Sequence, residues 1–600
     1  MPAVTTPPTT WRVPTRGQAA WFRVRVWGHV ALRTWRELRA ARVDRHSATT
    51  RLADGPVLVE RRTPLWHDGR EEEFALVAGK VENLRIARRA FDGVVVPAGA
   101  VFSFWKQLGR PTRSRGFVEG REIRAGCVVP VIAGGLCQLS NALATCAVGS
   151  GMTLVERHGH TARIEKETAA PGTLEAVDAT VSWNYVDLRI TAPFDWRLEV
   201  EMTGDELVVR VRAERVHAPA SALRAIPLVA TKSIAPLARG CLTCDETRCY
   251  RHPGVTAAVE KDTTAVLVDA WSPEFAAWLR DHADGAAWFV PWVRRARRSA
   301  GAWPTAGAHT VARLAAWRRT ALLRLRAGEG GGRQDALVRG QRWLAQALAE
   351  RLEPRHTHLV VDQALLLPLA QCGALQGRVY DVLVKALPIH EIQRRLDEAA
   401  RRWPHAGSLK DFRLGTDQGE AEMRALRGAR RLVTPHAEVA RHLRSACDVP
   451  VEVVPWDVPL PSSPRTTERI PSTPPVVVFP ASALPRKGAL ELAAAMRHLG
   501  WRLLVLGTPS TDAELWRGVD VEHVGYRDRA WLARADVVAL PAHVEHAPRA
   551  LLLALAHGLP VVATRACGLP PSPALHAVER GDVAGLIAAL ERAAGRRGSA

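Results

Sequence analysis

The feature that most constrains the fold is an alternation of short apolar runs with helical stretches over the second half of the chain. Each run has the length of a strand that is buried on both faces, and a turn or helical segment follows it. This order is typical of βαβ units, which form parallel sheets. We therefore expect an α/β fold here. The predicted strands are Ala265–Asp269, Ala287–Pro291, His358–Asp362, Val379–Val384, Arg431–Thr434, Val451–Pro455, Val476–Phe479, Leu503–Leu506, Asp536–Leu540 and Pro560–Ala563.

The alternation is interrupted at 461–475, where the sequence PSSPRTTERIPSTPP is rich in proline, serine and threonine. A stretch with several prolines and no apolar period is typical of a linker. Two doubly wound sheets on either side of it would each offer a binding crevice at the carboxyl ends of their strands. We therefore expect two α/β domains, at 255–460 and at 476–600.

The last domain carries two informative blocks, FPASALPRKGALELAAAM at Phe479–Met496 and PAHVEHAPRALLLALAHGLPVVAT at Pro541–Thr564. These blocks resemble the donor-binding domain of retaining glycosyltransferases with the GT-B fold. The resemblance implies two doubly wound, Rossmann-like domains, of which 255–460 is the acceptor side. It also implies a nucleotide-sugar donor.

In the first block, the resemblance assigns Arg486 and Lys487, followed by Gly488, to binding of the donor diphosphate. The physical reason holds independently, because a leaving nucleoside diphosphate carries charge that cations and a helix N-terminus stabilise. The alternative for this basic pair is a solvated charged loop.

In the second block, Glu545 matches the first of two family glutamates, and its implied role is to face the donor sugar. The second glutamate position is Leu553 here, and no other acid lies between Glu545 and Glu579. This departure leaves open a degenerate transferase half that acts as a non-catalytic scaffold. Glu545 could also be an acid that satisfies a helix N-terminus. We find no Asp-x-Asp motif, so we expect no catalytic metal in this half.

The N-terminal half contains a different candidate site, in the stretch Val129–Thr161. Cys137 opens a segment of helical period, and a thiol in a first helical turn faces unpaired N–H groups that favour the thiolate. His158 or His160 could complete a Cys-His pair, with Asp178 orienting the imidazole. The alternative for Cys137 is a small buried hydrophobic residue.

Four blocks of this half resemble the VanW family, which is named for a vancomycin-resistance cluster. The blocks are Lys80–Trp105, Gly135–Leu143, Glu156–Thr161 and Asp178–Ile190, within a region from Leu58 to Pro253. The resemblance implies an α+β domain at 55–254 and a cell-envelope context. It does not imply a particular reaction.

Three of the nine cysteines lie close together near the end of this domain. Cys241, Cys244, Cys249 and His252 have the spacing Cys-x2-Cys-x4-Cys-x2-His. Thiolates and an imidazole at such spacing can surround one zinc ion tetrahedrally. An iron–sulfur cluster is the competing interpretation. Four protein ligands leave no open position, so a structural role is favoured over a catalytic one.

Residues 1–54 are expected to be a basic N-terminal extension. Within it, Ala19–Val43 has a helical period in which tryptophans and arginines are interleaved. Such a helix can lie on an anionic membrane surface, or it can be a solvated helix packed on its own domain. We find neither a secretory signal nor an apolar run long enough for a membrane span. A cytoplasmic protein, peripheral at the inner face of the membrane, is therefore expected.

The net charge of +21 does not by itself indicate a nucleic-acid partner. Only eight of the 82 basic residues are lysine, and this arginine excess is typical of GC-rich coding. No RNA-binding or zinc-finger motif supports such a partner either. The sequence instead predicts a glycosyltransferase acting from a nucleotide-sugar donor on a cell-envelope-related acceptor, fused to a VanW-like domain. A non-catalytic envelope scaffold and Cys-dependent chemistry in the VanW-like domain are the alternatives.

Overall fold

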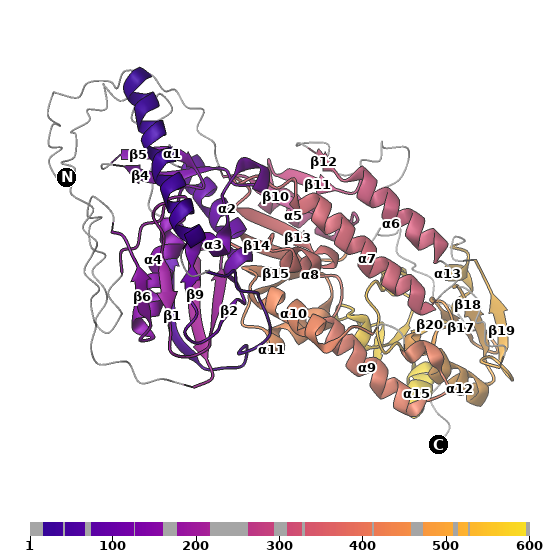
Figure 1. Cartoon of the computed structure of the whole chain (residues 1–600). Helices are drawn as coiled ribbons and strands as arrows, with labels where there is room; N and C mark the ends of the chain where they lie inside the picture. The colour runs from indigo at the N-terminus through magenta and orange to yellow at the C-terminus, as the bar shows by residue number, and fades with distance from the viewer. Residues whose placement is uncertain are drawn as a thin grey trace, which may run out of the picture. The chain divides into compact units, whose positions relative to one another are not determined.

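The computed structural model describes residues 16–39, 43–66, 74–124, 127–159, 177–215, 262–292, 309–326, 330–410, 413–457, 472–507, 514–525 and 529–595. They form two compact units (Figure 1). Unit 1 contains Met1–Thr263, Leu352–His358 and Leu375–Val379, and unit 2 contains Thr264–Arg351, Leu359–Ala374 and Tyr380–Ala600. The predicted fold class is confirmed, because unit 1 has antiparallel sheets and unit 2 has parallel sheets.

Unit 1 is built on a four-stranded sheet of order β1-β9-β8-β2, against which helices α2 and α4 pack. Its strands are β1 Val57–Pro64, β2 Val95–Val96, β8 Trp196–Met202 and β9 Glu206–Ala213. The smaller strands are β3 Phe102–Ser103, β4 Glu119–Arg124, β5 Cys127–Ile132, β6 Thr153–Glu156 and β7 Arg189–Thr191. The helices are α1 Arg16–Arg39, α2 Phe74–Phe91, α3 Phe104–Leu108 and α4 Cys137–Gly149.

Strand β8 explains why one face of this sheet forms the core of unit 1. Its residues alternate, so that Trp196, Leu198, Val200 and Met202 are buried while the residues between them are more exposed. This period of two is the pattern of an antiparallel strand with one face on the core.

The segment Val181–Tyr185 has the composition of a strand but forms a turn. The turn is closed by a two-way backbone bridge between Ser182 and Val186, with N···O distances of 2.9 and 3.0 Å. The apolar side chains of this turn are nevertheless used for packing, since Trp183 meets Trp105 edge-on with ring centroids 5.5 Å apart.

Unit 2 contains two parallel sheets, the first of order β12-β11-β10-β13-β14-β15-β16. Its strands are β10 Thr264–Leu267, β11 Ala287–Val290, β12 His309–Val311, β13 His358–Asp362, β14 Val379–Leu383, β15 Arg431–Thr434 and β16 Val451–Val453. Its helices are α5 Ala276–His282, α6 Arg313–Leu325, α7 Gly330–Ala349, α8 Gln363–Gln371, α9 Ile389–Arg402, α10 Thr416–Arg427 and α11 Ala437–Ala446. We call this part the first lobe.

The second lobe has a six-stranded sheet of order β19-β18-β17-β20-β21-β22, in which all five pairings are parallel. Its strands are β17 Val476–Phe479, β18 Arg502–Val505, β19 Asp520–His523, β20 Val537–Leu540, β21 Val561–Thr564 and β22 Leu575–Val578. Its helices are α12 Ala489–Leu499, α13 Trp531–Arg534, α14 Arg549–Ala556 and α15 Val583–Ala593.

In both lobes the strand order reverses next to the first strand, between β10 and β13 in the first lobe and between β17 and β20 in the second. The loops that leave the carboxyl ends of two such strands diverge to opposite faces of the sheet, and ligands of doubly wound folds bind in the crevice between them. The predicted linker at 461–475 lies mostly outside the described residues.

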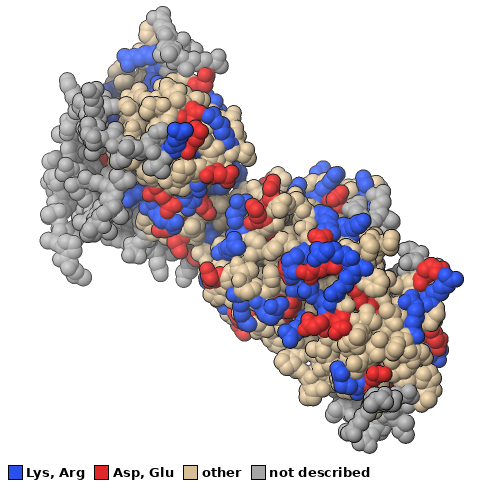
Figure 2. Space-filling model, turned by 90° about the horizontal axis from the view of Figure 1, so that it is seen from below, with Lys and Arg blue, Asp and Glu red and all other residues tan. Residues whose placement is uncertain are grey.

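Much of the arginine excess in the described residues is neutralised by neighbouring acids. Glu391 accepts from Arg394 and Arg395, and Glu438 accepts from Arg395 and Arg441. On the face shown in Figure 2, basic and acidic side chains are accordingly interspersed. Among the helices that the structure describes, none has the length and apolar character required to cross a bilayer.

Candidate donor site and the other predicted sites

Two loops meet where the strand order of the second lobe reverses. The loop after β17 ends in a 3-10 helix, Pro485–Lys487, and the loop after β20 runs from Pro541 to the start of α14. The two are joined through the backbone, because His543 N–H donates to Arg486 O at 3.0 Å. The predicted residues Arg486, Lys487, Gly488 and Glu545 are thereby brought together at the switch point of the second lobe.

Lys487 and Glu545 form an ion pair at this switch point. Lys487 Nζ donates to Glu545 Oε2 at 2.8 Å, and the two side chains are only 18% and 10% exposed. Burial raises the pKa of Glu545, but the charge and hydrogen bond of Lys487 and the N–H of Ala547 together bring this pKa below its usual value. Glu545 is therefore ionised at neutral pH, and a buried ammonium is held in place beside it.

Glu545 also occupies the free backbone donors ahead of α14. Its Oε1 accepts from His546 N–H at 2.8 Å and from Ala547 N–H at 3.0 Å. Both donors precede Pro548, the N-cap of α14, so Glu545 orders the loop and does not cap the helix. The same carboxylate binds Lys487 with its other oxygen, so one side chain orients both the loop and the cation.

Gly488 allows the two loops to approach closely. Its φ is +78°, and a Cβ at this position would lie 2.1 Å from Pro541 O. No other residue adopts this conformation at low cost, and none would leave the two backbones in contact. The glycine after the basic pair therefore places Lys487 against the second loop.

A buried acid–histidine pair, which the sequence did not reveal, lies next to this site and holds His543 in place. Glu491 of α12 is 1% exposed, and its Oε1 lies 2.9 Å from His543 Nε2. Trp403 Nε1 of the first lobe donates to the same oxygen at 2.9 Å. Burial raises the pKa of Glu491. The hydrogen bond and charge of His543 and the hydrogen bond from Trp403 lower this pKa by more than burial raises it, so Glu491 is ionised.

The first lobe contributes a second buried histidine, His436. Its Nδ1 accepts from Val439 N–H, which leaves Nε2 to donate to Glu545 O at 2.9 Å. Gly568 packs against the imidazole so closely that a Cβ there would lie 2.0 Å from Nδ1. The backbone of Glu545 is therefore held from the other lobe. The sequence contained one indication that histidines are part of this site, because His543 and His546 flank Glu545 in the segment His543-Val-Glu-His546.

His546 is a neutral imidazole at the same place. Burial, together with the charges of Lys487 and His436, lowers its pKa to about 3. Its Nε2 is buried and has no hydrogen-bond partner among the described residues. Leu553, at the position of the second family glutamate, is partly buried and packs against the core of the second lobe instead.

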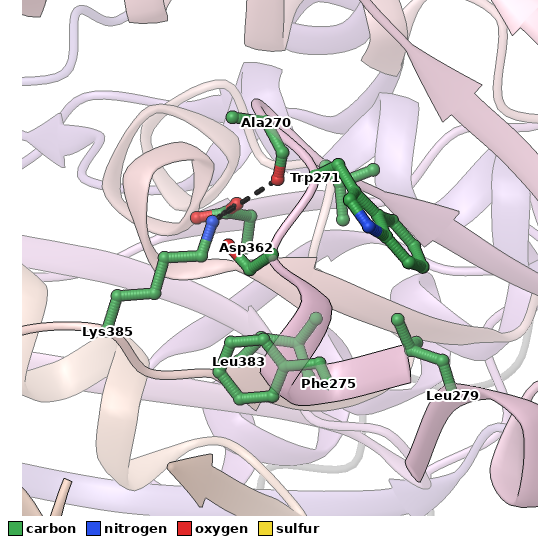
Figure 3. A pocket seen from close by; sticks show the side chains of 9 residues that line it. Ala270, Trp271, Phe275, Leu279, Asp362, Leu383 and Lys385 are labelled. Carbon is green, nitrogen blue, oxygen red and sulfur yellow. Dashed lines mark hydrogen bonds and ion pairs between the residues drawn. The ribbon is translucent and has the colours of Figure 1, made fainter. Parts of the chain in front are cut away.

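The switch point of the first lobe holds a small hollow with a volume of about 10 Å³ (Figure 3). Asp362, at the end of β13, is fully buried and forms an ion pair with Lys385 Nζ at 2.5 Å. Lys385 also reaches the carbonyl oxygen of Ala270, at 3.4 Å, and Trp271 forms one wall. Polar groups and an aromatic ring therefore lie at the strand ends of this lobe too.

In unit 1, Cys137 lies where it was predicted, at the first residue of α4, and is partly exposed. Its sulfur is 3.5 Å from Thr180 Oγ1 and 3.9 Å from Val181 O. The imidazole of His158 contacts Glu156, at 3.2 Å, rather than the predicted partner Asp178, which is exposed. The described residues therefore do not bring His158 to Asp178, and the alternative base, His160, lies outside them.

Lys80 of α2 is a further buried group in unit 1. It is 4% exposed, and its side chain crosses Gly135, where a Cβ would lie 2.1 Å from Lys80 Cγ. Its Nζ has no hydrogen-bond partner among the described residues. Burial, with a smaller contribution from the Arg121 charge, lowers the pKa of Lys80 to about 7.

The remaining predicted features of unit 1 concern α1 and the metal cluster. Arg33 of α1 forms a two-fold hydrogen bond to Glu156, with distances of 2.9 and 2.7 Å, while Trp21 and Trp27 are more than half exposed. The predicted metal ligands Cys241, Cys244, Cys249 and His252 lie outside the described residues. Within the described ranges, no group of three or more metal-binding side chains is found.

Unit 2 is thus a two-lobed protein of the doubly wound class, with polar side chains at the switch point of each lobe. Residues 474–595 match the family model described as glycosyl transferases group 1, and residues 79–212 match that of VanW like protein. Both resemblances predicted from the sequence are confirmed for these segments.

Among curated proteins, the chain is 26% identical over 152 residues to the vancomycin B-type resistance protein VanW of Enterococcus faecalis, which is 25% of this chain and 54% of that protein. It is 33% identical over 107 residues to the uncharacterized protein YoaR of Bacillus subtilis, 18% of this chain and 33% of that protein. The chain therefore spans about half of the first relative and a third of the second. The solved structure of sucrose-phosphate synthase from Thermosynechococcus elongatus is 14% identical, with a TM-score of 0.38 over 55% of this chain and 89% of that one.

Proposed function

We propose that unit 2 is a glycosyltransferase that moves a sugar from a nucleotide-sugar donor to a cell-envelope-related acceptor. The main observation behind this proposal is the largely buried Lys487–Glu545 ion pair at the switch point between β17 and β20. The match of 474–595 to glycosyl transferases group 1 supports the class of reaction. The name of the curated VanW relative, a vancomycin-resistance protein, motivates the envelope acceptor.

In this reaction the bond between the sugar anomeric carbon and the diphosphate breaks, and the acceptor hydroxyl oxygen forms the new bond. The hydroxyl proton passes to an oxygen of the nucleoside diphosphate, which departs with the bonding electron pair. Lys487 has three donors, of which Glu545 Oε2 and Val544 O accept two, so the third can bind the departing diphosphate. Arg486 adds a second positive charge. The neutral Nε2 of His546 is available for a hydrogen bond to the donor.

The polar groups of Asp362 and Lys385, beside Trp271, mark the acceptor side in this proposal. A sugar ring stacks well on an indole face, and its hydroxyls bond to a carboxylate or an ammonium. Because Leu553 occupies the position of the second family glutamate, the carboxylate expected at the donor ribose is missing. This difference favours a second candidate function, a scaffold that binds nucleotide without turnover.

Calorimetry with UDP and GDP tests donor binding, and sugar release from UDP- and GDP-sugars tests turnover. Lys487→Met is expected to weaken diphosphate binding about 10- to 100-fold, the contribution of a hydrogen bond to a charged group. Lys487→Met combined with Glu545→Gln removes the unpaired buried charge, so it is expected to restore stability but not binding. Arg517→Gln, an exposed arginine of the same lobe, is the control. Equal binding in all four proteins rejects the donor site, and binding without sugar release in the wild type selects the scaffold.

For the N-terminal half, a cytoplasmic location at the inner face of the membrane is supported by α1. The residues Trp21, Val24 and Trp27 are 64%, 58% and 61% exposed, and the arginine that attaches the helix to unit 1, Arg33, lies on its opposite side. Tryptophans with flanking arginines suit an anionic lipid interface. Vesicle flotation of the wild type and of Trp21→Glu with Trp27→Glu tests this location.

Within the same half, Cys241, Cys244, Cys249 and His252 are proposed to hold one structural zinc ion. The support is the ligand count and spacing alone. Metal analysis of the purified chain is expected to give one zinc that Cys244→Ser loses. Iron with visible charge-transfer absorption would instead identify an iron–sulfur cluster.

A further inference from the structure

Helix α6 carries a continuous apolar stripe that faces solvent. Leu314, Trp317, Ala321 and Leu325 follow one another at spacings of three and four residues, which places them on one face of the helix. Leu314 is 63%, Trp317 66% and Leu325 84% exposed. Trp343 of the neighbouring helix α7 extends the surface and is 40% exposed.

The opposite side of α6 is packed on the first lobe. Ala315 and Ala316 are buried, and Arg319 is paired with Asp269, two residues beyond the end of β10. The helix is therefore oriented by its small residues and by this ion pair. Its largest apolar side chains are left outside, the reverse of the arrangement in an ordinary surface helix.

The charge of α6 has one sign. The helix contains four arginines and no acid, and with Arg319 engaged, Arg313, Arg318 and Arg324 remain exposed around the stripe. Arg318 also lines a shallow groove between α6 and α7, together with Trp317, Leu322, Leu325 and Trp343. Clustered tryptophan and leucine side chains on a monomer mark an interaction surface, and the arginines require an anionic partner.

We propose that this face of α6, with Trp343, binds the surface of an anionic phospholipid bilayer. Trp317, Leu325 and Trp343 would enter the interface, and the three free arginines would contact the headgroups. A second copy of the chain is disfavoured, because a two-fold contact would bring the same arginines against one another. The proposal concerns the unit that carries the transferase lobes, and it is independent of α1 and of donor binding.

The test uses the full chain and vesicles of phosphatidylcholine, with and without about 30 mol% phosphatidylglycerol. Binding is measured by co-sedimentation in a chain that carries Trp21→Glu and Trp27→Glu, so that α1 does not contribute. In this background, Trp317→Glu with Leu325→Glu is expected to lower the partition coefficient about 100-fold. Arg318→Gln with Arg324→Gln is expected to lower it about fivefold per arginine, and only with phosphatidylglycerol present.

Val453→Glu is the matched control, because Val453 is an apolar residue of the same unit that is 47% exposed. It is expected to leave binding unchanged. All these side chains are exposed, so unfolding temperature and UDP titration should match those of the background chain. Equal vesicle binding by the α6 variants and the background would overturn the proposal. The proposal would also be overturned if the background chain does not bind vesicles and instead forms a dimer, and if Trp317→Glu dissociates that dimer.

Discussion

Lys80 gives the most direct quantitative test of the structure of unit 1. Its pKa falls from an ordinary 10.5 to about 7 because the ammonium is buried without an acid beside it. A shift of this size corresponds to about 5 kcal/mol at 1.36 kcal/mol per pH unit. The side chain is only 4% exposed, so solvent screening does not reduce this value appreciably.

The sign follows from proton binding in the two states. Between pH 7 and 10.5 the unfolded chain keeps the Lys80 proton while the folded chain has lost it. Stability attributable to Lys80 therefore rises with pH across this window. Below pH 7 the full cost of the buried charge is present, and above 10.5 it is absent. Lys80→Met removes the titrating group and is expected to be the more stable protein at about pH 6.5, by several kcal/mol.

The assay is urea unfolding of the wild type and of Lys80→Met from about pH 6.5 to 10, followed by circular dichroism and tryptophan fluorescence. The quantity of interest is the difference between the two proteins, because other titrating groups cancel in it. That difference is expected to shrink as pH rises. Lys106→Met, an exposed lysine of the same unit, is the control and should give a flat difference. A flat difference for Lys80→Met as well would refute the buried, unpaired amine.

Three further outcomes are expected. Gly488→Ala should destabilise unit 2 by about 3 kcal/mol in thermal unfolding, because the position has a positive φ and the added Cβ would lie 2.1 Å from Pro541 O. Gly500→Ala has a positive φ but open space around the Cβ, so it should cost only about 1 kcal/mol in the same assay. His543→Leu should cost about 3 to 5 kcal/mol, because it leaves the Glu491 charge buried, and Glu491→Gln in the same chain should recover part of the loss. Iodoacetamide should alkylate Cys137 before the buried Cys146 of the same unit, as read by peptide mass mapping.

The sheets of unit 2 could be predicted from sequence because their strands are apolar on both faces. Val476–Phe479 and His358–Asp362 agree residue for residue with β17 and β13. Strand β8 was missed, because its apolar residues alternate with charged ones and no continuous run marks it. The turn at Ser182–Val186 has the composition of a strand, but it closes on itself through a backbone bridge that composition does not reveal.

The candidate donor site could be predicted only in part. The two loops and the residues Lys487 and Glu545 are local motifs, so their positions follow from the sequence. Their mutual ion pair, and the support from His436 and Trp403, depend on contacts between segments far apart in the chain. Such contacts leave no periodic signal. For Cys137, the helix start was predictable, whereas the direction of His158 toward Glu156 was not.

The hydrogen bond from His436 to the carbonyl of Glu545 has a practical consequence for domain exchange. Grafting 474–595 alone onto another first lobe would separate the loop that contains Glu545 from the imidazole that Gly568 packs against. The junction of a folded chimera therefore belongs upstream of β15, so that His436 is transferred together with the loop it binds. A matched histidine in the new first lobe would serve equally well.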